Sequence, residues 1–136
     1  MKPKKYKIYL DFDGTVVEHE YPRIGKYNVG AFDVIAKLQA AGHEIILNTY
    51  RANCNDGTLK KAIIYLNRAE EIDLIPKVEK KKIEPQPWNW KNFHRTQTVY
   101  VDDICPGIPL KFSPTAQCDM VDWERVDAEF LRERIY

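Results

Sequence analysis

Short apolar segments alternate with helix-like segments along most of the chain, and this alternation constrains the fold more than any other feature. Residues 6–10, 43–49, 72–77 and 98–103 carry runs of Ile, Leu, Val and Tyr with the length of strands. Strands that alternate with helices form βαβ units, in which helices cover both faces of a parallel sheet. We therefore predict an α/β fold, a three-layer sandwich with a mainly parallel central sheet.

Helical periodicity is found in three further segments. Apolar residues recur on one face of residues 31–41, of a segment that begins near Asp56 or Thr58, and of a C-terminal segment. The apolar positions are Phe32, Ile35, Leu38 and Ala41; Leu59, Ala62, Ile63 and Leu66; and Trp123, Val126 and Phe130. Residues 78–96 show no clear period, and we expect a loop with one helical turn there.

The composition is that of an ordinary globular chain, and we assign residues 1–136 to a single domain. Hydrophobic residues make up 44% and charged residues 30%, which indicates neither a disordered nor a fibrous protein. The formal net charge of +1 gives no overall attraction for nucleic acid. No apolar run reaches the ~18 residues that a membrane span needs, so no membrane partner is expected. Three cysteines without CxxC spacing favour a reduced protein, and we expect a cytoplasmic location.

Polar side chains stand at the carboxyl end of each predicted strand. They are, in chain order, Asp11 and Asp13, Thr49, Lys77, and Asp102 and Asp103. In open parallel sheets, ligands bind in the crevice beyond the carboxyl ends of the strands. These side chains are therefore predicted to meet in one site.

Carboxylates gathered in one crevice repel each other and raise one another's pKa unless a cation lies among them. Mg²⁺ prefers oxygen ligands in octahedral geometry and commonly includes substrate phosphate oxygens among them. The acidic cluster therefore predicts Mg²⁺ as cofactor. The hydroxyl of Thr49 and the ammonium of Lys77 are suited to the oxygens of a transferring phosphoryl group.

Three stretches of the chain resemble motifs of the haloacid dehalogenase (HAD) superfamily. "LDFDGTVV" matches the opening DxDGT motif of its phosphatases, "IILNT" matches an apolar strand that ends in Ser or Thr, and "VYVDD" matches an apolar strand that ends in an acidic pair. The order of the motifs and their placement at strand ends agree over residues 6–107. The resemblance implies a Rossmann-like sheet of the HAD type and a phosphatase that hydrolyses phosphate monoesters.

The resemblance also implies a role for each motif residue. Asp11 would be the nucleophile that becomes a transient aspartyl phosphate, and Asp13 would be the general acid and base. Mg²⁺ would be held by Asp11, by the main-chain carbonyl of Asp13 and by Asp103, with Asp102 in support. Thr49 would donate a hydrogen bond to the phosphoryl oxygens.

The phosphate-binding lysine of the superfamily's third motif has several candidates here. Lys77 directly follows the third predicted strand, and we favour it on that ground. Lys80, Lys81 and Lys82 lie close enough along the chain to compete.

Three further residues are predicted to contact the substrate. Gly14 and Thr15 belong to the opening motif, and Arg51 stands two residues beyond Thr49, where a surface salt bridge is an equal alternative. Between Asp13 and Thr49 the chain has room only for a loop and one helix. We therefore expect a capless member of the superfamily.

Alternatives to a phosphatase stay open at this point. A catalytically silent phosphate-binding protein would keep all of these residues, and a phospho-receiver domain would share an acidic cluster but place its acidic pair first. The phosphorylated partner is a small molecule, a nucleotide or a nucleic-acid end, and a homo-oligomer is left open. A nucleotide or a nucleic-acid end could bind a basic aromatic edge formed by "EKKK" with Trp88 and Trp90. Anchoring of the loop by the two tryptophans is the favoured alternative.

Overall fold

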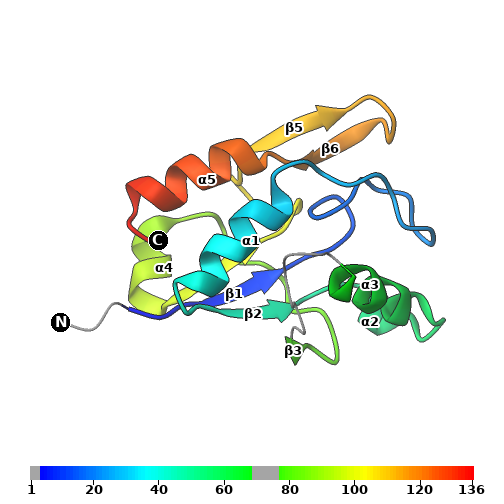
Figure 1. Cartoon of the computed structure of the whole chain (residues 1–136), viewed down its shortest axis with the longest axis horizontal. Helices are drawn as coiled ribbons and strands as arrows, with labels where there is room; N and C mark the ends of the chain where they lie inside the picture. The colour runs from blue at the N-terminus through cyan, green and yellow to red at the C-terminus, as the bar shows by residue number, and fades with distance from the viewer. Residues whose placement is uncertain (1–3, 69–76) are drawn as a thin grey trace.

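The structure is a computed structural model, and it describes residues 4–68 and 77–136. Its elements are β1 (Lys7–Leu10), α1 (Ala31–Ala40), β2 (Glu44–Leu47), α2 (Arg51–Cys54), α3 (Thr58–Asn67), β3 (Lys77–Val78), α4 (Trp90–Thr96), β4 (Thr98–Val101), β5 (Leu110–Ser113), β6 (Cys118–Val121) and α5 (Trp123–Arg132) (Figure 1). No helix among the described residues is both long and apolar enough to cross a bilayer.

The central sheet has four strands in the order β3-β2-β1-β4, and all neighbours are parallel. Ile8 pairs with Ile45 on one side and with Val99 on the other, so the three longer strands end level with one another. Helices flank this sheet, and the predicted three-layer α/β sandwich is confirmed. Of the third predicted strand, residues 72–76 lie outside the described residues, and only Lys77 falls in β3.

One contiguous core holds the layers together. Ile8 and Leu10 of β1 are almost fully buried, as the alternation predicts. The predicted face of α5 is buried too. On α1, Ile35 and Leu38 are buried as predicted, whereas Phe32 is only half-buried, and the two helices lie side by side along the sheet (Figure 1). Burying one such side chain stabilises the fold by about 1.5–3 kcal/mol, so the amphipathic helices are fixed on the sheet by these faces.

A hairpin of β5 and β6 was not predicted from the sequence. Its strands pair antiparallel, with Leu110 opposite Val121, and they do not join the central sheet. Polar residues interrupt both strands, so the sequence there shows no run of strand character. The hairpin contacts the loop after β1, because the Val121 N–H donates to the Gly14 carbonyl at 3.0 Å.

Residues 78–96 contain the seven-residue helix α4, which is longer than the single helical turn predicted there. The indole N–H groups of Trp88 and Trp90 both donate to Glu129 of α5, at 3.1 and 3.0 Å. Their rings pack edge-on against Phe93, and the ring of Trp90 also meets Phe130. The tryptophans therefore anchor the loop to the core, as the favoured alternative predicts.

Candidate active site

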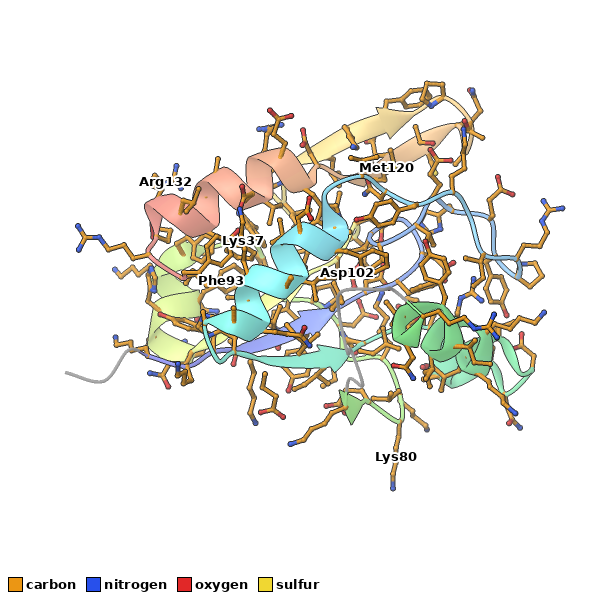
Figure 2. The ribbon with its side chains drawn as sticks, viewed as in Figure 1. Lys37, Lys80, Phe93, Asp102, Met120 and Arg132 are labelled. Atoms are coloured by element: carbon orange, nitrogen blue, oxygen red, sulfur yellow. The ribbon has the colours of Figure 1, made fainter. Side chains whose placement is uncertain are left out.

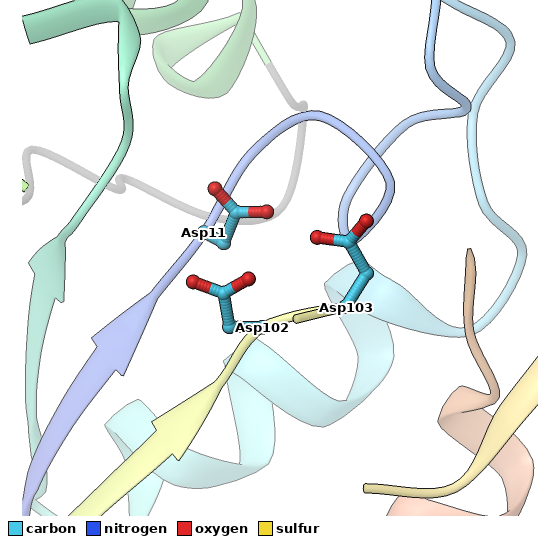
Figure 3. A group of neighbouring side chains, drawn as sticks. All are labelled: Asp11, Asp102 and Asp103. Atoms are coloured by element: carbon cyan, nitrogen blue, oxygen red, sulfur yellow. The ribbon is translucent and has the colours of Figure 1, made fainter. Parts of the chain in front are cut away.

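Three carboxylates meet at the carboxyl ends of β1 and β4, as the strand order requires. Asp11 follows β1, and Asp102 and Asp103 follow its neighbour β4. Each of the three offers an oxygen, and these oxygens lie within 4.8 Å of one another (Figure 3). Asp11 and Asp102 are 4% and 1% exposed, so the cluster is largely removed from water.

Burial and the charge of Asp102 raise the pKa of Asp11 well above its ordinary value. The ionised form of Asp11 is thus disfavoured unless positive charge is added beside it. Three carboxylates at this spacing match the hard oxygen ligands of Mg²⁺. The described residues therefore fit the predicted metal.

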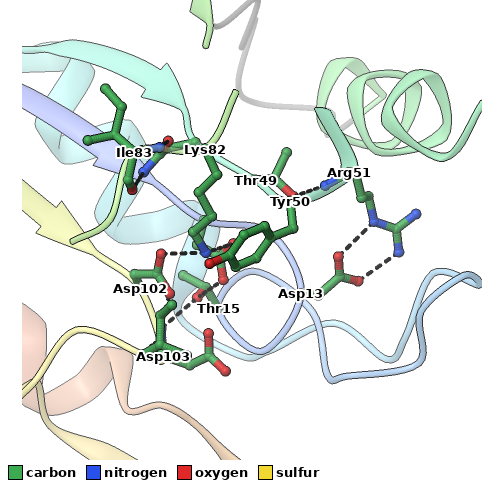
Figure 4. A network of polar contacts seen from close by, with 12 residues as sticks. Asp13, Thr15, Thr49, Tyr50, Arg51, Lys82, Ile83, Asp102 and Asp103 are labelled. Carbon is green, nitrogen blue, oxygen red and sulfur yellow. Dashed lines mark hydrogen bonds and ion pairs between the residues drawn. The ribbon is translucent and has the colours of Figure 1, made fainter. Parts of the chain in front are cut away.

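Lys82 supplies one positive charge to the cluster. Its Nζ lies 2.8 Å from Asp102 Oδ2 and 3.3 Å from Asp11 Oδ1, and its side chain is 2% exposed (Figure 4). Burial acts to lower the pKa of Lys82, but the charges of Asp11 and Asp102 outweigh this and raise the pKa. Lys82 is therefore held as a buried cation between two carboxylates.

Hydrogen bonds to the end of β2 direct the segment that carries Lys82. Asn48 receives the Ile83 N–H at 2.8 Å and donates to the Ile83 carbonyl at 2.9 Å. The Lys82 N–H donates to Asn53 Oδ1 at 2.9 Å. These bonds fix the backbone on both sides of the lysine side chain, which then reaches into the cluster.

The prediction that Lys77 is the phosphate-binding lysine of the site is wrong, because Lys77 lies on the surface. Lys77 Nζ pairs with Glu44 Oε1 at 2.7 Å on the surface, and its side chain is 77% exposed. Lys80 and Lys81 are exposed as well, and Lys80 extends away from the ribbon (Figure 2). Strand position pointed to Lys77, whereas the path of the following loop brings Lys82 to the carboxylates.

Asp13 has a partner of its own, Arg51. The guanidinium Nε and Nη2 donate to the two Asp13 carboxylate oxygens, each at 2.7 Å (Figure 4). Nη2 also donates to the Arg23 carbonyl, and Nη1 donates to the carbonyls of Pro22 and Thr58. Arg51 is 1% exposed, and every nitrogen of its guanidinium is engaged. The prediction that Arg51 binds substrate directly is therefore corrected: the residue holds Asp13 and the loop around it.

Thr15 and Gly14 shape the turn and do not present side chains to a substrate. The Thr15 hydroxyl donates to Asp11 Oδ2 at 3.0 Å and accepts from the Asp103 N–H at 3.3 Å, and Thr15 is fully buried. Gly14 has φ +79°, and a Cβ there would lie 2.4 Å from His19 Nε2 and 2.5 Å from Asp103 Oδ2. Thr15 thus positions Asp11, which corrects its assignment to substrate contact, and only glycine fits the turn.

Thr49 lies where the sequence placed it. It follows β2, it is buried, and it lines the same cavity as Asp11 and Asp13. Its Oγ1 accepts the Arg51 N–H at 3.2 Å, which fixes the rotamer beside the carboxylates. The cavity has a volume of about 190 Å³, and Lys82 also lines it.

Sequence reasoning missed His19, which belongs to the long loop before α1. His19 Nε2 lies 2.7 Å from Asp103 Oδ2, and this hydrogen bond raises the pKa of the imidazole. Burial acts to raise the pKa of Asp103, but its contacts with His19, Asp11 and Asp102 together outweigh this and lower the pKa of that carboxyl. No metal-ligand spacing surrounds His19 in the sequence, so no signal pointed to it.

Comparison with known proteins supports the fold and names no activity. No protein-family model and no curated protein matches the chain. A solved structure from Bacteroides thetaiotaomicron, described as that of a conserved protein, is similar to this chain with 28% sequence identity and a TM-score of 0.61. The similarity covers 96% of this chain and 93% of the other. The two chains thus share a fold over almost their whole lengths.

Proposed function

We propose that this protein is a Mg²⁺-dependent phosphatase that hydrolyses a phosphate monoester through an aspartyl phosphate on Asp11. The observation that carries the proposal is the meeting of Asp11, Asp103 and Lys82 at one cavity that Asp13 also lines, with the buried Asp102 paired to Lys82. The resemblance of "LDFDGTVV", "IILNT" and "VYVDD" to HAD phosphatases supports the same reaction.

In the first step, a carboxylate oxygen of Asp11 attacks phosphorus and the bond to the ester oxygen breaks. Asp13 transfers a proton to the leaving oxygen, which departs as an alcohol. Lys82 and the hydroxyl of Thr49 face the cavity and stabilise the negative charge on the phosphoryl oxygens. Thr15 keeps the attacking carboxylate in place by its hydrogen bond to Oδ2.

In the second step, water attacks the phosphorus of the aspartyl phosphate. Asp13, now ionised, takes the proton of this water, and the bond between phosphorus and the Asp11 oxygen breaks. Inorganic phosphate leaves, and both aspartates return to their starting states. Arg51 holds the Asp13 carboxylate between proton transfers and so acts as a positioning residue.

Mg²⁺ would be held by Asp11, by Asp103 and by the main-chain carbonyl of Asp13, while Asp102 supports the site through Lys82. When bound, the ion supplies charge neutralisation for the phosphoryl group and for the crowded carboxylates.

The test is Mg²⁺-dependent hydrolysis of a generic aryl phosphate. We expect turnover by the wild type, and loss of about 10³-fold or more in Asp11→Asn and Asp13→Asn, since each removes a reacting group. Asp33→Asn, an exposed aspartate on α1, is the matched control and should keep wild-type activity. Activity that survives Asp11→Asn would exclude the covalent mechanism.

A second candidate function is phosphate binding without turnover. The observation that favours it is the two-pronged pairing of Asp13 with Arg51, which stabilises Asp13 as an anion and opposes its use as an acid. Under this alternative, a broad panel of phosphate esters gives no turnover, while Mg²⁺-dependent phosphate binding is retained and is lost in Lys82→Met.

A further inference from the structure

Two tyrosines at the mouth of the cavity each cover one of its buried cations. The Tyr50 ring centroid lies 4.5 Å from Lys82 Nζ, and the Tyr21 ring centroid lies 5.2 Å from the central carbon of the Arg51 guanidinium (Figure 4 for Tyr50). Both rings line the cavity, and they are 47% and 45% exposed. One aromatic ring thus stands over the Asp11 side of the site and another over the Asp13 side.

Both rings are fixed by their hydroxyl groups. Tyr50 donates its O–H to Glu84 Oε1 at 2.6 Å, and Tyr21 donates its O–H to Asp56 Oδ2. Because each ring is also packed on a cation, its side chain has little freedom left to lose when a ligand binds. Tyr21 and Tyr50, which we call the rim of the cavity, are therefore restrained before any substrate enters.

Next to His19 and the charged groups already described, the cavity lining also has an apolar part. The tyrosine hydroxyls are already used, and Ile104, 47% exposed, lines the cavity beside Asp103. The Cys54 thiol, also at the cavity, donates to the Tyr50 carbonyl at 3.2 Å. On this apolar part a sugar with many hydroxyls would regain few of the hydrogen bonds that it loses to water, whereas a planar ring would stack.

We propose that the substrate is a phosphate monoester whose leaving group carries an aromatic ring that packs against Tyr21 and Tyr50. This inference rests on the proposed function in that it calls the ligand a substrate. The preference for an aromatic ring is a property of binding and can be measured without turnover. Two chemical sources supply such a ring: an aryl group next to the ester oxygen, and a nucleobase one ribose away.

The experiment measures binding of phosphonates, which have no ester oxygen to cleave, to the wild type with Mg²⁺ by calorimetry. Benzylphosphonate and cyclohexylmethylphosphonate have the same number of carbon atoms and differ in the aromatic ring. We expect benzylphosphonate to bind about tenfold more tightly. The isosteric phosphonates of adenosine 5′-monophosphate and ribose 5-phosphate form a second pair, and the pair with the larger ratio identifies the source of the ring.

Variants assign the preference to the rim. Tyr50→Leu and Tyr21→Leu should each reduce the benzyl to cyclohexyl ratio toward one, while Tyr50→Phe and Tyr21→Phe should retain it because the ring remains. Phe112→Leu replaces an exposed aromatic residue on β5, outside the cavity, and should leave the ratio unchanged.

The outcomes separate this inference from the proposed function. Equal binding within both pairs overturns the aromatic preference, even where aryl phosphate turnover depends on Asp11. Failure of all four phosphonates to bind overturns it as well. A clear ratio in a protein without turnover on any ester supports the aromatic site and overturns the phosphatase.

Discussion

Asp11 and Asp13 stand two residues apart, yet the fold gives them opposite surroundings. Asp11 is 4% exposed and shares its space with two other carboxylates and one ammonium, which lies 3.3 Å away. Asp13 has a complete partner, the Arg51 guanidinium, with both contacts at 2.7 Å. The Asp11 side is therefore short of positive charge, and the Asp13 side is balanced.

In the proposed mechanism, this difference in surroundings would give the two aspartates separate chemical roles. A divalent cation that joined the crowded, buried cluster would stabilise the ionised form of Asp11. The cation would also bind the phosphoryl group and so bring it close to this carboxylate. In the proposed mechanism, the pairing with Arg51 would hold Asp13 in a fixed direction for proton transfer to the leaving oxygen. The tight turn at Gly14 and the buried Arg51 make the separation possible.

The largest expected effect comes from breaking the balanced side. Arg51→Gln leaves Asp13 without its countercharge and leaves three backbone carbonyls with fewer donors. Removing one partner of a buried ion pair costs about 3–5 kcal/mol, and we expect the free energy of unfolding from urea titration to fall by that amount.

Two controls accompany this measurement. Arg23→Gln removes an exposed pair with Glu20, whose arginine side chain is 81% exposed, and should change the free energy of unfolding by less than about 1 kcal/mol. The double variant Asp13→Asn/Arg51→Gln should be more stable than Arg51→Gln alone, since no uncompensated charge remains. A fall below about 1 kcal/mol in Arg51→Gln would show that the pair is not structural.

The second effect tests the single ammonium on the Asp11 side. Lys82→Met should lower kcat/KM about 100-fold, because it removes a preorganised donor for the phosphoryl oxygens. Lys77→Met, at the exposed lysine five positions earlier, should leave kcat/KM unchanged within about twofold. Equal losses in the two variants would contradict the placement of Lys82 in the site.

The third effect concerns the missing charge on the Asp11 side. Burial and the charge of Asp102 raise the pKa of Asp11 above its ordinary value of 3.8, so the folded protein binds more protons than the unfolded chain above about pH 4. Without metal, stability should therefore fall as pH rises from about 4 through the raised pKa. Ten-fold excess of Mg²⁺ over its Kd should restore about 1.4 kcal/mol at neutral pH and less at pH 4.

Thermal unfolding with and without Mg²⁺ at both pH values measures this effect. Asp11→Asn removes the buried charge, so the variant should be at least as stable as the wild type without metal and should gain little from Mg²⁺. An equal gain from Mg²⁺ at both pH values would place the ion elsewhere on the protein.

The strand ends were predictable from the sequence, and the loops that complete the site were not. Asp11, Thr49, Asp102 and Asp103 follow apolar runs, and parallel pairing in register brings such residues to one edge of the sheet. The position of Lys82 depends on hydrogen bonds between the Asn48 side chain and the backbone of Ile83, in the loop after β3. Such hydrogen bonds leave no periodic pattern in the sequence.

The role of Arg51 was also not predictable from the sequence. Its position beside Thr49 was visible, but its direction depends on carbonyls of Pro22, Arg23 and Thr58 that meet only in the folded chain. His19 likewise reaches Asp103 through a loop without regular structure. Pattern arguments therefore located the site and missed the pairing within it.

The smallest expected effect lies at Thr49, between the two sides. Its Oγ1 accepts the Arg51 N–H, and its hydroxyl proton is available for a phosphoryl oxygen at the cavity. Thr49→Val keeps the shape and removes one neutral hydrogen bond, worth about 1 kcal/mol, so kcat/KM should fall about fivefold with an unchanged pH profile. Thr49→Ser should recover most of the activity because it restores the hydroxyl. A loss as large as that of Lys82→Met would mean that Thr49 acts through Arg51 and Asp13, and that the balanced side takes part in more than proton transfer.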